Sequence, residues 1–471
     1  MPDLSCDVAV IGAGTAGRAA ERSARRHGAK TLLIDEAFSG TTCVAVGCMP
    51  SKLLIAAGEA AHAVRQAHVF GVKAPPPEID GRAVMERVRR ERDKFLASDL
   101  QTIEDLPEGV AVKAKARFAG PTTLVLDDGR TVKARTVVIA TGSYPAVPES
   151  FDSVSNLVLT NETIFELPTL PASVAVIGAG ALGLELAQAL SRLGVEITVF
   201  DKSKEIAGLE DEAVEASLRE ILLKEFAILT EVETEGEPAE GGVLVKWSGK
   251  ERGEKRFDHV LVSAGRPPRL KDLDLEKSGI ELGDKGVPVF RETTMQCGAS
   301  PVFIAGDADA SRPILHEASD EGTIAGRNAA LHPTVEPVER SVPFILTFTD
   351  PPVAVIGTVP DADNKTVVTG KASYADQGRA KVMARNAGLV HFYATRDGGR
   401  IIGASMAAPA VEHMAHLVAF AVQEGKTAAE LLDMPFYHPT FEEGLKPALR
   451  EICEAAGTLA PSRDEARPSA P

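Results

Sequence analysis

Two apolar runs, each followed at once by glycines, occur in the first half of the chain. Residues 7–11 form a short apolar run of the kind that suits a strand buried on both faces. A glycine-rich turn and an Ala/Arg-rich helical stretch follow, and then Lys30–Ile34 reads as a second strand ending in Asp35. The same order recurs over 174–201, where the second strand ends at Asp201. The pattern predicts an α/β fold with two Rossmann-like units.

Both glycine turns carry the spacing Gly-x-Gly-x-x-Gly between a strand and a helix. Such glycines let the backbone approach a pyrophosphate, whose charge the helix N-terminus binds, while the acid after the second strand accepts from a ribose hydroxyl. Two sites in one chain indicate one tightly bound and one exchanging dinucleotide. Asp201 favours a free 2′-hydroxyl, and hence NAD over NADP. The residues of the two fingerprints are Gly12, Gly14, Gly17 and Asp35, and Gly178, Gly180, Gly183 and Asp201.

Hydrophobic periodicity beyond the fingerprints predicts the remaining elements. An aliphatic helix is expected over Leu53–Ala67, and a long amphipathic helix with a solvated charged face over residues 81–105. Residues 230–262 read as a small β-meander. From about Ser341 antiparallel strands dominate, and the Pro-, Ser- and Ala-rich end, residues 460–471, is expected to be disordered. Further short strands are expected over 110–112, 123–126, 136–139, 302–304, 353–356, 389–393 and 401–406, with helices near 411–424.

Cys43 and Cys48 are the two cysteines that lie close together in the sequence. Pro50 follows at the start of the aliphatic helix, where its missing N–H costs no hydrogen bond. The second cysteine is therefore expected at a helix N-terminus, which favours a thiolate. A redox dithiol fits this pattern. A pair of small buried residues, or half of a zinc site, is the alternative, although a zinc site needs two more ligands and none lie nearby.

Composition narrows the class of protein. The chain has 471 residues, which predicts about three domains, and a net charge of −16, which argues against a nucleic-acid partner. Cys6, Cys297 and Cys453 are scattered, so a secreted disulfide framework is not expected. No uninterrupted apolar stretch reaches about 18 residues, so no membrane span is expected. The first strand begins by Asp7 and leaves no room for a signal peptide, and a cytoplasmic location is the default expectation.

These motifs together resemble the FAD-dependent pyridine nucleotide–disulfide oxidoreductases. The resemblance extends from Asp7 to about Ile452, and its most specific part is the stretch from Gly40 to Lys52 around the two cysteines. It implies FAD on the first fingerprint, with Asp307 on the ribityl chain, and NAD(H) on the second. It also implies an α+β C-terminal dimerisation domain. Further cofactor contacts are implied at Thr42, Lys52, Thr141, Gly142 and Gly265.

The resemblance also implies roles for the catalytic residues. Cys48 would face the flavin, and Cys43 would exchange with a disulfide or dithiol substrate. His438, paired with Glu443, would reach the partner subunit's site as acid–base. Its intrinsic pKa suits that task. Lys52 and Glu185 match positions that pair beside the flavin in this family.

Several residues favour oxidation of dihydrolipoamide by NAD⁺ within this family. Ser51 stands where glutathione reductases usually have a second Lys, and Ala181 stands where they have a Tyr. The helix after Lys52 has no Arg before Arg65, whereas the carboxylates of glutathione would call for basic contacts. Phe436 departs from the lipoamide pattern, which has a second His there, and Arg269 departs from the family's usual Asn. A mercuric reductase or another low-molecular-weight disulfide reductase is the alternative, and an NADH or redox sensor without turnover is a third reading.

The expected organisation follows from these assignments. The FAD-binding domain comprises residues 1–145 and a return segment, 265–340; the NAD-binding domain comprises 146–264; the dimerisation domain comprises 341–459; and 460–471 form the tail. A homodimer with a shared active site is expected. A lipoyl-domain or small-molecule disulfide is the expected substrate, with a 2-oxo acid dehydrogenase complex as a possible assembly.

Overall fold

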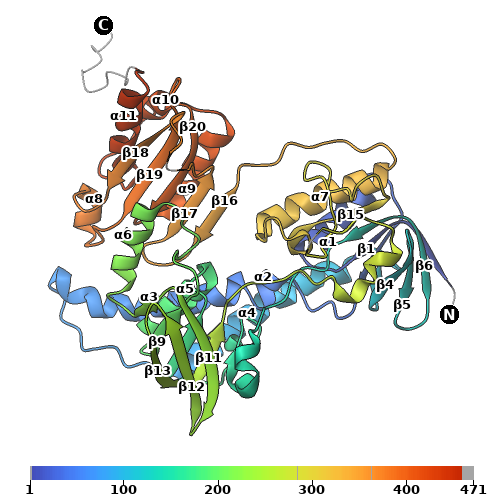
Figure 1. Ribbon diagram of the computed structural model, residues 1–471, viewed down its shortest axis with the longest axis horizontal. Helices are drawn as coiled ribbons and strands as arrows, with labels where there is room; N and C mark the ends of the chain where they lie inside the picture. The colour runs from blue at the N-terminus through green and yellow to red at the C-terminus, as the bar shows by residue number, and fades with distance from the viewer. Residues whose placement is uncertain (1–2, 284, 362, 459–471) are drawn as a thin grey trace.

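The computed structural model describes residues 3–283, 285–361 and 363–458. Its first sheet has seven strands in the order β3-β2-β1-β6-β5-β4, with β15 added in parallel beside β6 (Figure 1). Strands β2 and β15 and the C-terminal halves of β1 and β6 are almost wholly buried, and helices α1 and α7 pack against them. The bounds are β1 Leu4–Ile11, α1 Thr15–Arg26, β2 Thr31–Asp35, β3 Ala111–Lys113, β4 Ala116–Gly120, β5 Thr123–Leu126, β6 Thr131–Ile139, β15 Val302–Ile304 and α7 Leu315–Leu331.

A second, wholly parallel sheet has the strand order β10-β9-β8-β14-β7. Helix α5 packs against it, and the expected meander follows as three antiparallel strands, β11-β12-β13. The bounds are β7 Val158–Leu159, β8 Ser173–Ile177, α5 Ala181–Arg192, β9 Glu196–Phe200, α6 Glu212–Leu222, β10 Ala227–Leu229, β11 Val232–Ala239, β12 Gly242–Gly249, β13 Gly253–Phe257 and β14 His259–Val262.

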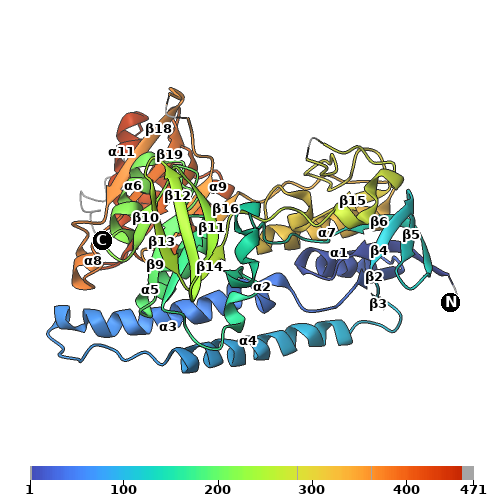
Figure 2. The same cartoon turned by 60° about the horizontal axis from the view of Figure 1, so that its bottom comes forward.

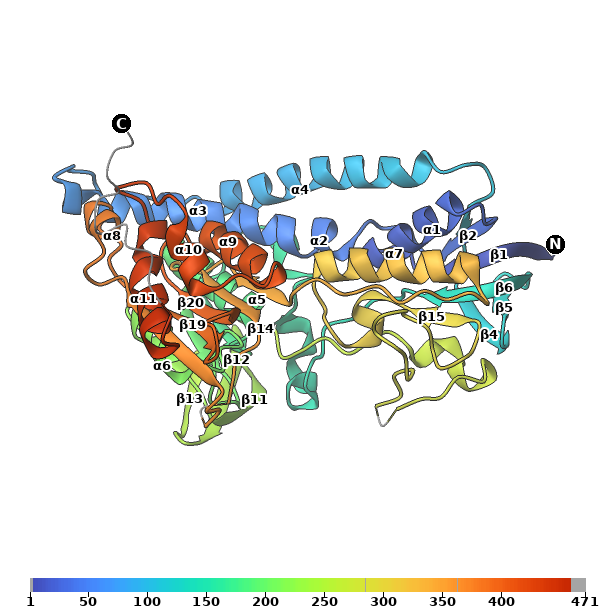
Figure 3. The same ribbon diagram turned by 90° about the horizontal axis from the view of Figure 1, so that it is seen from above.

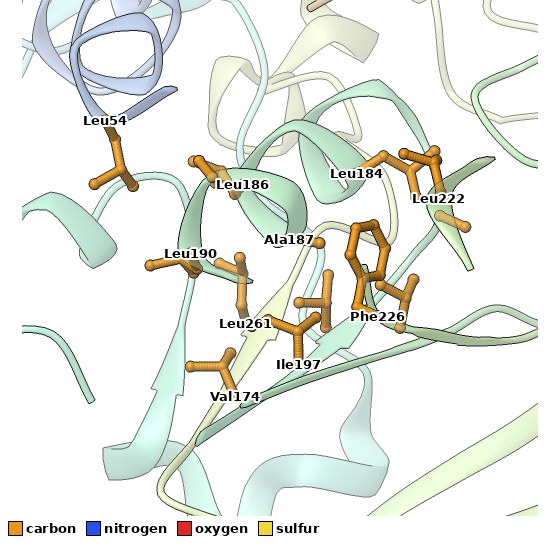
Figure 4. Packing of buried hydrophobic residues seen from close by; sticks show 14 of the residues in the cluster. Leu54, Val174, Leu184, Leu186, Ala187, Leu190, Ile197, Leu222, Phe226 and Leu261 are labelled. Atoms are coloured by element: carbon orange, nitrogen blue, oxygen red, sulfur yellow. The ribbon is translucent and has the colours of Figure 1, made fainter. Parts of the chain in front are cut away.

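Two long helices, α3 (Cys48–Gln66) and α4 (Gly81–Glu104), run side by side along one edge of the molecule (Figures 2 and 3). Leu54 of α3 packs into the same core as Leu186 and Leu190 of α5 (Figure 4). Gly58 permits this approach, since a Cβ there would lie 2.9 Å from the Ala189 carbonyl oxygen. Helix α3, which follows β2 in the chain, is therefore packed against α5 beside the second sheet.

The segment Thr42–Phe70 is the one helical stretch among the described residues that is long and apolar enough to cross a membrane. Gly47 interrupts it, separating the short helix α2 (Thr42–Ala45) from α3, and charged residues such as Lys52 and Glu59 lie within it. One face of α3 packs against α4 and α5, and 22% of the apolar stretch is buried.

The C-terminal lobe is built on an antiparallel sheet, as the alternating pattern predicts, in the order β16-β17-β20-β19-β18. Figure 1 shows this lobe above the second sheet and apart from the first. The bounds are β16 Phe344–Thr347, β17 Val353–Gly357, β18 Val367–Ser373, α8 Gly378–Val382, β19 Leu389–Thr395, β20 Ile401–Ala407, α9 Val411–Gln423, α10 Ala428–Asp433 and α11 Lys446–Ala455.

A buried polar contact attaches helix α6 to this lobe. Asp211 caps α6 by accepting hydrogen bonds from the amides of Ala213 and Val214. Its other oxygen lies 2.6 Å from Nδ1 of His391 and accepts a 2.7 Å bond from the Tyr393 hydroxyl. Burial alone would raise the pKa of the Asp211 carboxyl, but these donors lower it.

The elements that the sequence predicts are present near their expected bounds, although β6 and α3 each begin five residues earlier than predicted. Several observed elements had no predicted counterpart, namely α2, α6, α7, α8, α10, α11, β4, β7, β10, β16 and β18. The predicted disordered end, residues 460–471, lies outside the described residues. The structure also contains short 3₁₀ segments, of which η2 is the longest and is kinked at Val154. Their bounds are η1 Ala67–Phe70, η2 Glu149–Leu157, η3 Ile164–Glu166, η4 Lys271–Leu273, η5 Leu275–Lys277, η6 Gly306–Asp309 and η7 Glu442–Leu445.

Candidate active site

The two cysteines lie in consecutive helices, the short α2 and the long α3. Cys43 belongs to α2, and Cys48 is the first residue of α3, at the helix N-terminus that the sequence predicts. Gly47 makes the sharp join possible, because a Cβ there would lie 2.8 Å from the Thr42 carbonyl oxygen. Cys43 is half-buried; Cys48 is exposed as a residue, although its sulfur is partly enclosed by the protein, and both are free thiols.

The electrostatics of the pair separate the roles of the two sulfurs. A hydrogen bond from Cys43 lowers the pKa of the Cys48 thiol to about 6, assisted by the charge of Lys52 and opposed by burial and by Glu185. The same hydrogen bond, together with burial, raises the pKa of Cys43. Cys48 is therefore a thiolate near neutral pH while Cys43 keeps its proton.

A salt bridge crosses from the dithiol helix to the second nucleotide-binding unit. Lys52 Nζ lies 2.7 Å from Glu185 Oε2, and Glu185 is buried with its other oxygen accepting from the Phe348 amide. The Lys52 ammonium also lies 4.4 Å from the centre of the Phe348 ring. The pair inferred from the family resemblance thus forms.

The first fingerprint has the geometry of a pyrophosphate site. Gly12 and Gly17 are packed against backbone, but a Cβ on Gly14 would meet nothing within 4 Å, and no side chain caps α1. Open space above an uncapped helix N-terminus fits a dinucleotide phosphate. Asp35 accepts from the Ala13 amide at 2.9 Å and from two amides of its own loop, which leaves acceptor capacity for a ribose hydroxyl.

The second fingerprint repeats that arrangement. A Cβ on Gly180 would meet nothing within 4 Å, α5 has no side-chain cap, and Gly178 and Gly183 are packed closely. Asp201 accepts from the Ala179 amide at 2.6 Å and from the Ser203 amide. Both sites therefore fit the nucleotides that the sequence predicts for them.

Asp307 lies in η6, just after β15, and takes part in a polar cluster. The Ser143 hydroxyl donates to Asp307 Oδ2 at 2.5 Å, and Arg266 donates from Nε to the same hydroxyl at 3.1 Å. Gly142 and Gly265 border open space, as a nearby ligand would require. The Thr141 hydroxyl instead donates to the Arg269 carbonyl at 2.7 Å, while Thr42 is exposed on the first turn of α2.

His438 and Glu443 pair within one subunit. Both carboxylate oxygens lie 3.1 Å from Nδ1 of His438, whose side chain is 79% exposed. The carboxylate orients the ring and leaves its exposed edge available for proton transfer. Figure 1 shows helices α10 and α11, which flank this segment, at the end of the C-terminal lobe away from α2. Within the described residues, the side chain of His438 contacts Glu443 and neither cysteine.

Two residues near the dithiol were missed by the sequence reasoning. Asn161 is buried and bonds the Val46 carbonyl, between the two cysteines. Asp99 accepts from the Thr41 amide at 2.9 Å and pairs with Arg18, so the expectation that the charged face of α4 is merely solvated is wrong at this position. Neither residue belongs to a motif, and only the folded chain brings it to the dithiol loop.

The other cysteines are poorly placed for chemistry. Burial raises the pKa of Cys6 and Cys297 to about 12, and Cys453 is buried in the core of the C-terminal lobe. These three thiols behave as small apolar side chains.

The chain resembles known proteins over nearly its full length. It is 30% identical to the dihydrolipoyl dehydrogenase of Thermus scotoductus, covering 96% of this chain and 98% of that one. It is 31% identical to the mercuric reductase of Shigella flexneri, covering 94% and 80%. A solved HOCl-induced flavoprotein disulfide reductase of Escherichia coli has the same fold, with a TM-score of 0.81 at 20% identity over 94% of this chain and 99% of that one.

Two family models match along the chain. The description "Pyridine nucleotide-disulphide oxidoreductase" matches residues 6–322, and the dimerisation domain of the same family matches 344–449. These matches cover both fingerprints, the cysteine pair, and the His438–Glu443 segment. The chain therefore belongs to the pyridine nucleotide-disulphide oxidoreductases, flavoproteins that use FAD and NAD(H).

Proposed function

We propose that this protein is an NAD-dependent dihydrolipoyl dehydrogenase, which oxidises dihydrolipoamide to lipoamide. The observation that carries the proposal is the cysteine pair, with Cys43 in α2 and Cys48 at the N-terminus of α3, on the same helix as Lys52 of the Lys52–Glu185 ion pair. Relatives named dihydrolipoyl dehydrogenase, at 29% and 30% identity over more than nine-tenths of both chains, support this substrate class. The aliphatic start of α3, with Leu53 and Ile55 beyond Lys52, suits a neutral, narrow substrate.

The bound FAD supplies the two-electron link between NAD(H) and the cysteine pair. With the pair oxidised, a thiolate of dihydrolipoamide attacks Cys43 Sγ, and Cys48 leaves as a thiolate. The second thiolate of the substrate then attacks the substrate sulfur that is joined to Cys43 Sγ, and the bond between that sulfur and Cys43 breaks. This closes the lipoamide disulfide and releases Cys43 as a thiol once it gains a proton. Two electrons and two protons leave the substrate, and the dithiol holds the electrons.

The proton steps need a base near neutral pH. We assign this role to His438 of the partner subunit, because the helices that flank His438, α10 and α11, lie at the end of the C-terminal lobe away from α2 in Figure 1. Glu443 orients its ring. Phe420 and Tyr437, exposed apolar side chains on the same lobe, are consistent with a covered face in a dimer, and the dimerisation-domain match supports a homodimer.

The remaining site assignments form part of this proposal. FAD binds at the first fingerprint with Asp307 toward its ribityl chain, and NAD(H) binds at the second. Lys52 and Glu185 act beside the flavin, and Thr42, Thr141, Gly142 and Gly265 line the cofactor sites. The domain limits 1–145, 146–264, 265–340 and 341–459 belong to the same proposal, as do a cytoplasmic location and association with a 2-oxo acid dehydrogenase complex.

Mercuric ion reduction is the second candidate, because relatives of that name match at 30–31% identity. Cys453, the cysteine nearest the C-terminus, argues against it. Its side chain is buried in the core of the C-terminal lobe, where it cannot accept a metal ion from solvent. A sensor that reacts with NADH but does not turn over disulfides is the third candidate.

A substrate screen tests the proposal. Purified protein is assayed with NAD⁺ and dihydrolipoamide, and with NADH or NADPH against lipoamide, glutathione disulfide, coenzyme A disulfide and Hg²⁺. We expect the highest kcat/KM with the lipoamide couple and NAD(H), and its loss in Cys43→Ser. A preference for another acceptor would move the assignment to that substrate. Diaphorase activity that survives in Cys43→Ser, with no disulfide turnover in the wild type, would favour the sensor.

A further inference from the structure

Asn161 holds the loop between the two cysteines from outside. Its side chain is buried, with Nδ2 donating to the Val46 carbonyl oxygen at 3.0 Å and Oδ1 accepting from Nη1 of Arg266 at 2.9 Å. Val46 is the C-terminal cap of α2, where carbonyl groups have no partner within the helix. The amide therefore satisfies a group that would otherwise leave the loop less well defined.

The contact continues beyond Arg266 to the proposed flavin site. Arg266 donates to Ser143 through Nε at 3.1 Å, and Ser143 donates in turn to Asp307 at 2.5 Å. A continuous chain of hydrogen bonds thus runs from the carbonyl between Cys43 and Cys48 to the carboxylate proposed to bind the ribityl chain. Asn161 is the only side chain of this series that touches the dithiol loop directly.

We propose that Asn161 is a positioning residue that fixes the geometry of the Cys43–Cys48 pair relative to the flavin site. The inference rests on the proposed function, since it concerns the same dithiol. Val46 lies two residues before Cys48, so a displacement of its carbonyl moves Gly47 and the first turn of α3. The hydrogen bond from Cys43, which stabilises the Cys48 thiolate most, depends on that turn. Loosening the loop should therefore reduce the thiolate fraction at a given pH.

Two variants separate the contacts of Asn161. Asn161→Ala removes both hydrogen bonds. Asn161→Asp keeps an acceptor for Arg266 but places a carboxylate against the Val46 carbonyl, which it cannot bond. Asn156→Ala alters an exposed asparagine in the same segment and serves as the control. For each reduced holoenzyme, the thiolate-to-flavin absorbance band and the alkylation rate of Cys48, followed by mass, are measured against pH.

We expect the pH midpoint of both signals to rise by about half a unit or more in Asn161→Ala and in Asn161→Asp, a threefold change in the thiolate-to-thiol ratio. Asn156→Ala should match the wild type. Wild-type midpoints in both folded Asn161 variants would overturn the inference. So would loss of folding in both variants, which would assign Asn161 to stability alone. An absent flavin band in the wild type would instead refute the proposed function.

Discussion

Lys52 Nζ lies 2.7 Å from Glu185 Oε2, and this ion pair links α3, which begins at Cys48, to α5, which follows the second glycine fingerprint. The two partners act on Cys48 in opposite directions. After the hydrogen bond from Cys43 and the opposing effect of burial, Lys52 lowers the pKa of the Cys48 thiol and Glu185 raises it.

Neutralising the two partners should therefore have opposite effects. Lys52→Met is expected to raise the pKa of Cys48 and Glu185→Gln to lower it, each by up to about one unit, or about 1.4 kcal/mol. The pH dependence of Cys48 alkylation in the reduced enzyme measures this. Lys94→Met, which alters an exposed ion pair on α4, should leave the midpoint unchanged. Shifts of the same sign in both variants would contradict the assignment.

Cys43 and Cys48 should differ when replaced one at a time. Cys43→Ser keeps a hydroxyl donor beside Cys48, so a thiolate-to-flavin charge-transfer band should persist. Because the pKa of Cys48 is about 6, the band should be strong above that pH and fade below it. Cys48→Ser should lose the band at every pH. Absorbance spectra of the two purified variants decide, and a band seen only in Cys48→Ser would reverse the two roles.

Asp201 should make the enzyme prefer NADH to NADPH. A carboxylate near a 2′-phosphate costs about 1 kcal/mol or more in a water-like dielectric, so roughly tenfold discrimination is expected. Asp201→Asn removes the charge while keeping the shape and one acceptor, and should narrow the ratio of kcat/KM values. Lys204 is already paired with Glu212 at 2.6 Å, so Lys204→Ala should leave the ratio unchanged. Equal use of both cofactors by the wild type would contradict the prediction.

Subunit complementation tests the shared site. Cys43→Ser and His438→Ala proteins, each nearly inactive, are mixed under conditions that exchange subunits. A mixed dimer should have one site with both defects and one with neither. Its activity should approach half of the wild-type value. Mixing two batches of His438→Ala protein gives the baseline. If mass measurements verify exchange and activity stays at that baseline, His438 does not serve the partner's site.

Glu321 should make stability depend on pH. Burial raises the pKa of this carboxyl to about 8, with the charge of Asp309 adding to the effect and Arg340, 2.6 Å away, opposing it. Between about pH 4.3 and 8 the folded chain therefore holds a proton that the unfolded chain lacks, and stability falls as pH rises, by at most about 1.4 kcal/mol per unit. Urea unfolding at pH 5, 6.5 and 8 measures the slope.

Glu321→Gln should flatten that slope, because the amide does not titrate. Glu162→Gln, which alters an exposed carboxyl, should keep the wild-type slope. A slope that is unchanged in Glu321→Gln would mean that another group, such as Asp309, holds the proton.

The sequence predicted those parts of the molecule that are local along the chain. Each fingerprint lies within a single strand–turn–helix–strand unit, and Cys48 follows Gly47 directly at the helix start. The contacts of Asn161, Asp99 and Asp211 could not be predicted in this way. Asn161 reaches Val46 across 115 positions, and Asp211 reaches His391 across 180. Such pairs depend on how the sheets and lobes pack, which no local pattern specifies.

The two fingerprints contain the same contact at the same spacing. The Ala13 amide donates to Asp35 and the Ala179 amide to Asp201, each across 22 positions. Such agreement is what duplication of one ancestral βαβ module would leave behind. A module common to the two βαβ units would account for their shared ability to bind a dinucleotide, but not for any difference between the two units. What makes one cofactor resident and the other exchangeable must be encoded outside it, and a chimaera exchanging the residues that follow Asp35 and Asp201 is the direct way to locate that difference.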